Sequence, residues 1–277
     1  MLSARVGHTY GTVYRFIAPE QLLLAMSRLR LCLLNASYDP VDTRRNFRRE
    51  LDADLVEYHT PEGELPPLET ANAFEEFDGC LVTGSRASVY WDEAWIDEVS
   101  EWVQEAIETG MPCLGVCWGH QLLADALGGE VEGMDEYEIG YRTVEQRADS
   151  RLFSGIDDAF TAFETHSDRV ADLPPGARRI AENEHGIQAF QTGDVFGVQF
   201  HPEYDRATAE KVTRGKEGLP KERVERVVSG ITDENYTAAC ETKRLFSNFT
   251  GLVRERRREV AQGDHSSGAG GTPAKMD

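Results

Sequence analysis

The stretch MPCLGVCWGHQLLADALGG, residues 111–129, decides the fold class. Its first six residues, Met111–Val116, are a short apolar run that predicts a buried strand, and a helix-like pattern follows Cys117 and closes at Gly128 and Gly129. No linker separates the two. A strand that runs straight into a helix is typical of α/β proteins with a mostly parallel sheet.

Upstream sequence repeats this alternation of strand and helix. Three further apolar runs predict buried strands, at Leu29–Ser37, Ala53–His59 and Phe77–Ser85. Helical spacing appears at Thr43–Leu51 and again from Trp95 to Ile107, where Asp92 is the expected N-cap. We therefore expect a flavodoxin-like, doubly wound, mostly parallel sheet with helices on both faces.

The second half of the chain changes character. Short strands separated by turns are expected at 141–146, 161–164, 177–182, 187–191 and 195–200, and they predict a small antiparallel extension. A charged insertion at about 206–234 predicts a helix or two, and Tyr236–Arg257 predicts a long amphipathic helix.

These patterns predict one domain over residues 29–258. Residues 1–28 form an N-terminal extension outside the fold, so Met26 is an alternative start to Met1. Residues 259–277 are rich in Gly, Ser and Pro and are expected to be a disordered tail.

The composition of the chain limits the classes of partner that it is expected to bind. The formal net charge is −20 and the sequence pI is about 4.8, which argues against nucleic-acid binding. Basic residues are mostly Arg, so the acidic surface suggests a salt-adapted protein, with an ordinary acidic surface as the alternative. No apolar run approaches the length of a membrane span, and no signal peptide is expected. Five cysteines in no framework or zinc-ligand spacing favour a reducing, cytoplasmic location and no metal site.

The central question is what Cys117 does, because free cysteines are most often small buried hydrophobes. Its neighbours favour chemistry. Gly115 and Gly119 permit a sharp strand-to-helix turn, as in a nucleophile elbow, and the helix start directs N–H groups and a positive dipole end at the sulfur. Such settings lower the pKa of a thiol, so Cys117 is the candidate nucleophile.

A thiolate nucleophile needs a base, and the best candidate lies at the end of another apolar strand. VFGVQFHPEYD places His201 there, and Glu203 can orient the imidazole. His-Pro-Glu alone is a weak signal, since a surface turn would explain it. The N–H groups of Gly84 and Trp118 are candidates for stabilising an oxyanion at the same edge of the sheet.

Together these segments resemble the class I, or triad, glutamine amidotransferases, in particular the amidotransferase component of GMP synthase and its stand-alone relatives. GVCWGHQ and HPE carry the resemblance, TGSRASVY is similar to the oxyanion segment and THSD to a substrate-side segment, and the likeness covers about Leu29–Arg257. It implies that Cys117, His201 and Glu203 form the catalytic triad, that Gly84 and Trp118 form the oxyanion site, and that L-glutamine contacts Gln121, Ser167 and Asp168.

The implied reaction is hydrolysis of the glutamine side-chain amide through a glutamyl thioester, with no metal or organic cofactor. Departures exist: Thr83-Gly84-Ser85 replaces the Gly-Gly-Pro of many relatives, and the insertion is larger than the usual link after HPE. Trp118 follows the cysteine where proteases of the wider fold usually have histidine, which argues against a protease. His120 and His166 are expected to be structural.

The acceptor of the ammonia is not identified by the sequence. No glycine-rich phosphate loop follows a predicted strand, and GAGG at 268–271 lies in the expected tail. ATP-dependent amination would therefore need a separate synthetase, with a GMP-synthase-like partner as the expectation. The alternatives are a stand-alone γ-glutamyl amide hydrolase and a non-catalytic binding protein on the same fold.

Overall fold

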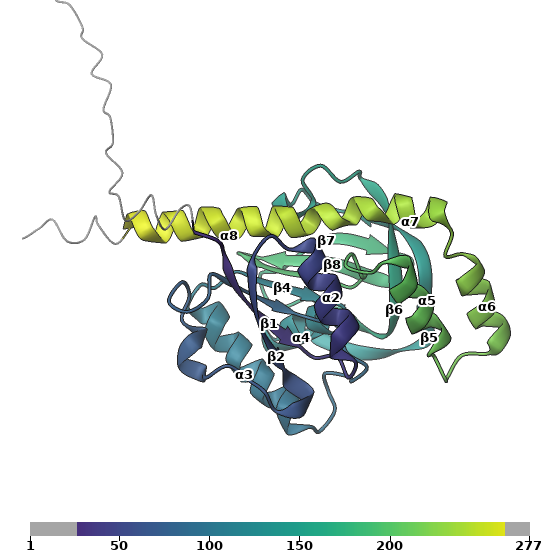
Figure 1. Ribbon diagram of the computed structural model, residues 1–277, viewed down its shortest axis with the longest axis horizontal. Coiled ribbons are helices and arrows are strands. Elements are labelled where there is room, and N and C mark those ends of the chain that lie inside the picture. Colours follow the sequence, from purple (N-terminus) through teal and green to yellow (C-terminus); the bar gives the residue numbers. More distant parts are fainter. Residues whose placement is uncertain (1–26, 264–277) are drawn as a thin grey trace, which may run out of the picture.

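A computed structural model describes residues 27–263, and these form a nine-stranded mixed sheet with helices on both faces (Figure 1). The strand order is β2-β1-β3-β4-β9-β8-β7-β5-β6. The predictions for Met26, for the rest of the segment before residue 27 and for most of the tail lie outside the described residues.

The first half of the sheet is parallel, and four of its five strands were predicted so. The fifth, predicted at 195–200 within the antiparallel extension, instead joins the two halves, because it pairs in parallel on one edge and antiparallel on the other. It contains β1 (Arg30–Asn35), β2 (Asp54–His59), β3 (Gly79–Val82), β4 (Cys113–Val116) and β9 (Val195–Val198). All of β3, β4 and β9 are buried, which explains why they appear in the sequence as continuous apolar runs rather than alternating ones.

The second half is antiparallel and comprises β5 (Glu130–Gln146), β6 (Ala159–Asp172), β7 (Arg178–Asn183) and β8 (Gly186–Thr192). The predicted extension is present, but β5 and β6 are much longer than the predicted strands. Their missed parts are half-exposed and polar on one face, so no apolar run marks them.

Alternate residues of the parallel strands face two separate hydrophobic clusters. Leu31, Leu33 and Leu81 pack with α2 (Pro40–Glu50) and α8 (Arg244–Gly263), which crosses the top of the view in Figure 1. Leu34 and Val82 pack with α3 (Ala94–Glu108) and α4 (Trp118–Ala126) on the opposite face. The aromatic stripe of α3 is therefore core packing.

The charged insertion forms three helices rather than one or two: α5 (Arg206–Arg214), α6 (Lys221–Ser229) and α7 (Asp233–Ala239). The long helix predicted from Tyr236 is interrupted, because α7 ends at Ala239 and a 3-10 turn precedes α8. α8 then continues to Gly263, and the predicted boundary at residue 258 falls inside it. The residues on both sides of 258 are good helix formers, so the helix does not end there.

Two smaller predictions are also settled by the helices. Asp92 does not cap α3, because the N-cap is Glu93, whose side chain makes no capping hydrogen bond. Among residues 27–263, no helix combines the length and the apolar character that crossing a membrane requires.

Candidate active site

The strand order brings three distant segments to one edge of the sheet. β3, β4 and β9 are neighbours and parallel, so their carboxyl ends meet at the same edge, where sites of open α/β sheets lie. Gly84 follows β3, Cys117 follows β4 and His201 follows β9. The Cys117 N–H donates to the Val198 carbonyl across 2.8 Å, which joins the turn to the end of β9.

Cys117 occupies a strained turn between β4 and α4. Its φ is 56° and its ψ is −105°, and Phe74 is the other non-glycine residue with positive φ within residues 27–263. The flanking glycines are sterically required: a Cβ on Gly115 would lie 2.2 Å from the Gly119 oxygen, and one on Gly119 would lie 2.2 Å from the Val82 oxygen. Strain of this kind is concentrated at functional sites.

His201 and Glu203 form a buried pair beside this turn. The His201 Nδ1 lies 2.8 Å from Glu203 Oε1, and the two residues are 5% and 2% exposed. The His201 N–H donates to the Phe163 carbonyl across 2.9 Å, which ties the residue to β6. The Tyr204 ring stacks on the imidazole at 4.1 Å between centroids. The imidazole is therefore held on one side by a carboxylate and on one face by an aromatic ring.

Cys117 and His201 meet around Gly84. A Cβ built on Gly84 would lie 3.0 Å from His201 Cε1 and 3.5 Å from Cys117 Cβ, so both side chains lie against this glycine. Burial lowers the pKa of His201, but the charges of Glu203 and Cys117 outweigh it and raise the pKa to about 10. The charged imidazolium is thus favoured, and an imidazolium stabilises an adjacent thiolate.

Backbone donors are available next to the sulfur. Trp118 is the first residue of α4, so its N–H has no intrahelical acceptor, and the dipole of α4 has its positive end there. The Trp118 side chain is 1% exposed and packs against Trp95 in the core. Only the backbone N–H of this residue is therefore a candidate for contact with substrate. Gly84 lies in the turn directly opposite, within contact distance of both reactive side chains.

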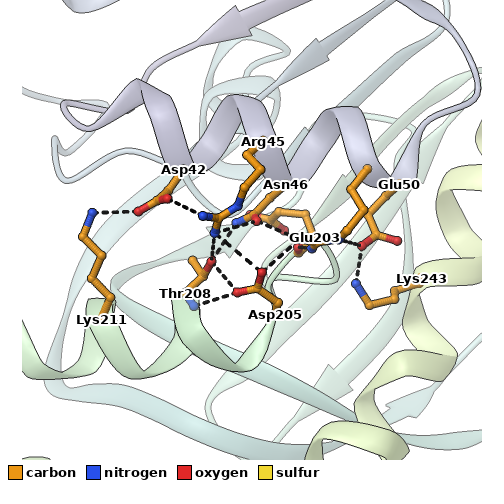
Figure 2. A network of polar contacts seen from close by, with 10 residues as sticks. Asp42, Arg45, Asn46, Glu50, Glu203, Asp205, Thr208, Lys211 and Lys243 are labelled. Carbon is orange, nitrogen blue, oxygen red and sulfur yellow. Dashed lines mark hydrogen bonds and ion pairs between the residues drawn. The ribbon is translucent and has the colours of Figure 1, made fainter.

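A polar network on α2 and α5 holds the segment that carries Glu203 (Figure 2). Arg49 donates to the Glu203 carbonyl across 2.6 Å and to Asp205 Oδ2 across 3.0 Å. Asp205 caps α5 by accepting from the Thr208 N–H at 2.7 Å, and Thr208 also accepts from Asn46 at 3.1 Å. The network connects the backbone of Glu203 to two helices that are far apart in the sequence.

A cavity of about 450 Å³ adjoins Cys117 and is lined by Gln121, Ser167 and Asp168, the three residues that the resemblance assigned to substrate. This volume is usual for a small-molecule site. Ser167 is exposed, whereas Gln121 is buried and its Nε2 donates to the Asp168 carbonyl at 2.9 Å and to Gln199. Gln121 therefore braces the Asp168 backbone as well as lining the cavity.

The Asp168 carboxylate is fixed by neutral donors. Ser88 donates to its Oδ2 and the Tyr90 hydroxyl donates to its Oδ1 at 3.1 Å. Neither donor carries a charge, so the negative charge of the carboxylate remains available at the cavity wall. The segment Ser88–Tyr90, which carries both donors, lies in the predicted oxyanion segment TGSRASVY.

Sequence analysis missed several residues at this site. Tyr204 directly follows HPE, so its position was a usable signal for its contact with His201. Arg49 and Lys216 had no such signal, because they lie in charged helical or loop sequence and reach the site through tertiary packing.

His120 is fully buried, whereas His166 is 4% exposed and lines the cavity beside Cys117. Burial lowers the pKa of His120 to about 3, so this residue is a neutral side chain packed on Phe190. Among residues 27–263, Glu138, Glu164 and His166 converge closely enough to ligate an ion. Burial lowers the pKa of His166, but the two carboxylates, with Glu138 Oε2 2.9 Å and Glu164 Oε2 3.5 Å from its Nε2, outweigh it and raise the pKa to about 10.

The family comparison matches this geometry. The model of the family described as "Glutamine amidotransferase class-I" matches residues 37–214, which include the cysteine turn and the His-Pro-Glu segment. A GMP synthase [glutamine-hydrolyzing] of Thermomicrobium roseum is 30% identical over 258 residues, covering 81% of this chain and 47% of that protein. One of an Azoarcus species is 34% identical over 174 residues, covering 57% and 31%. The chain thus spans about half or less of the length of these relatives.

Solved structures show the same fold. A glutamine amidotransferase of Thermotoga maritima superimposes with a TM-score of 0.69 at 24% identity, covering 83% of this chain and 99% of that one. One from Methylobacillus flagellatus gives a TM-score of 0.67 at 20% identity, covering 81% and 95%.

Proposed function

The chain belongs to the class I glutamine amidotransferases, and from this premise we propose that it hydrolyses the side-chain amide of L-glutamine through Cys117, His201 and Glu203. One observation carries the proposal. A cysteine in a strained, glycine-flanked turn lies beside a histidine that is paired with a buried carboxylate, 2.8 Å away. The non-catalytic alternative would leave this strain and this buried charge pair without a use.

In the first half of the reaction, the Cys117 thiolate attacks the amide carbon and a tetrahedral oxyanion forms. The N–H groups of Gly84 and Trp118 stabilise it, and one such donor is worth about 3–4 kcal/mol of barrier. The His201 imidazolium gives its proton to the leaving nitrogen, ammonia departs, and a glutamyl thioester remains on Cys117.

In the second half, neutral His201 takes a proton from water as the water attacks the thioester carbonyl. The same N–H groups stabilise the second oxyanion, and its collapse releases glutamate and restores the thiolate–imidazolium pair. Glu203 holds the imidazole in one orientation and offsets its charge throughout. These steps use side chains and backbone groups of this chain and route nothing through a cofactor.

We propose that the ammonia passes to a separate ATP-dependent synthetase of the GMP-synthase kind. The similarity to glutamine-hydrolysing GMP synthases supports this choice of acceptor. A stand-alone γ-glutamyl amide hydrolase would use the same triad, so dependence on a partner is the property that separates the two.

The free thiols bear on the cellular location of the protein, and its net charge bears on its dependence on salt. All five cysteines are unpaired, and Cys117 must stay reduced to react, so we propose a reducing, cytoplasmic setting. A net charge of −20 disfavours a compact state at low ionic strength through self-repulsion, so we also propose that activity rises with salt.

The test is glutamate release from L-glutamine by the purified chain, beside Cys117→Ala, at low and at high salt. Release that disappears in the variant supports the triad. Turnover that rises when a synthetase is added supports delivery of ammonia, whereas full turnover alone favours the hydrolase. No binding and no turnover of glutamine under any of these conditions would refute the proposal.

A further inference from the structure

The charged insertion supplies one wall of the candidate substrate cavity. The segment Gly215–Leu219, between α5 and α6, lines the cavity opposite Gln121 and Asp168. Lys216 also lines a second cavity of about 220 Å³ that contains Cys117 and His201. The insertion, which departs from the family pattern, therefore lies over the reactive cysteine.

Lys216 is half-buried and lines both cavities. Its Nζ lies 4.8 Å from the centre of the Tyr137 ring, and the Tyr137 hydroxyl lies 3.0 Å from Thr165 Oγ1 in the cavity wall. Burial lowers the pKa of Lys216, and Arg86 acts in the same direction, while Cys117 opposes them. A partly buried ammonium that faces an open cavity is poised for an anion.

Four other basic residues of the insertion have acidic partners. Lys211 pairs with Asp39 and Asp42 at 2.6 and 2.7 Å, and Arg214 pairs with Glu210 at 2.9 Å. Arg206 and Arg223 pair with Asp233 and Glu136. Within residues 27–263 no carboxylate lies within ion-pair distance of Lys216, although the chain carries 49 acidic residues against 29 basic ones.

The cavity therefore carries both signs of charge that a free amino acid needs. Asp168 supplies a negative charge held by neutral donors, and Lys216 supplies a positive charge without an acidic partner. Cys117 lies in the same cavity. An amino acid whose side-chain amide reaches Cys117 presents an α-ammonium and an α-carboxylate at its other end.

We propose that Lys216 binds the α-carboxylate of glutamine while Asp168 faces the α-ammonium, so that the insertion makes the site select the free amino acid. This inference rests on the proposed glutaminase function. A glutamine within a peptide has no free α-carboxylate and would leave Lys216 in the cavity without its counter-charge, which is costly. Arg86 also lines the cavity, but its side chain is exposed and lies over the Tyr38 ring.

The experiment compares L-glutamine with its α-amide, in which the carboxylate becomes a neutral carboxamide. Lys216→Met should raise the KM for glutamine about 10- to 100-fold with little change in kcat, the loss expected for one charge-assisted contact. The same variant should lower kcat/KM for the α-amide far less than for glutamine, so that the preference for glutamine over the α-amide falls about 10- to 100-fold. Lys216→Arg should restore most of the preference, and Lys221→Met on exposed α6 is the matched control.

The outcomes separate the two proposals. If glutamine is hydrolysed but Lys216→Met keeps the wild-type preference for glutamine over the α-amide, the role of Lys216 is refuted and the glutaminase function stands. If Arg86→Met alone removes the preference, the carboxylate site lies at Arg86 and the inference is also refuted. If wild-type protein hydrolyses neither compound and the Cys117→Ala protein binds neither in calorimetry, the proposed function itself fails.

Discussion

Gly84→Ala tests whether the geometry at the meeting point of Cys117 and His201 limits the reaction. The added Cβ would lie 3.0 Å from His201 Cε1 and 3.8 Å from its Nε2, so the imidazole must shift by a few tenths of an ångström. The Gly84 backbone is not in the left-handed region, so alanine fits its conformation. The N–H that we propose stabilises the oxyanion is retained. The substitution therefore displaces the base while leaving the other groups in place.

The expected cost is confined to the chemical step. A misplacement of 1 Å can cost about 100-fold, so a shift of a few tenths should lower kcat about 3- to 10-fold, or about 1 kcal/mol of barrier. Stability should change little, because the reduced entropy of the unfolded chain, worth about 0.4–1 kcal/mol, opposes the tight contact. The assay is glutamate release at saturating glutamine, with urea denaturation of the same preparation.

Gly251→Ala is the matched control. It adds the same methyl group on α8, where no heavy atom lies within 4 Å, so kcat should be unchanged and stability should rise by about 1 kcal/mol. Wild-type kcat in Gly84→Ala would refute the reasoning, because His201 would then tolerate displacement. A parallel loss of activity and folding would also refute it, because the damage would then be structural.

Three other substitutions probe the site and its support. Glu203→Gln should lower kcat about 10³–10⁴-fold, as expected when the orienting carboxylate is lost. The pKa of His201 is raised from 6.5 to about 10. Its contribution to stability, on the order of a few kcal/mol, is therefore complete below pH 6.5 and is lost as pH rises through 10. In urea denaturation at pH values from about 6 to 10, Glu203→Gln should reduce this dependence of the unfolding free energy on pH. Arg49→Leu should lower kcat several-fold with KM unchanged, because it frees the Glu203 carbonyl, and an unaltered kcat would show that the network does not position the triad. Gly119→Ala should cost about 3 kcal/mol of unfolding free energy, since its Cβ would overlap the Val82 carbonyl at 2.2 Å, and a normal urea midpoint would contradict that packing argument.

The sequence predicted β1, β3 and β4 well because these strands are buried over nearly all of their residues. Residues 113–116 carry no polar side chain, and the turn that follows is fixed by local sterics at Gly115 and Gly119. Local chemistry of this kind is visible without a structure. The assignment of Cys117 and His201 to one site also followed from the sequence, because the glycine-flanked cysteine turn and His-Pro-Glu were recognised together. The parallel pairing that joins their strands was not predicted.

The antiparallel half and the insertion were less accessible. β5 alternates between exposed and half-buried residues over much of its length, so the sequence of its first half resembled a loop. The role of Arg49 depends on a contact over 154 positions of sequence separation, and that of Lys216 depends on where α5 ends. Long-range packing decided these features, and no local pattern encodes it.

The place of β9 in the sheet has a consequence for synthesis of the chain. β9 is the last strand to be translated, yet it is central in the sheet, between β4 and β8. Until Val195–Val198 emerges from the ribosome, β4 and β8 have unpaired edges, and such edges invite aggregation. The same strand delivers His201 to Cys117. A nascent chain therefore cannot assemble its reactive pair before the sheet is closed, so the appearance of activity would report completed folding.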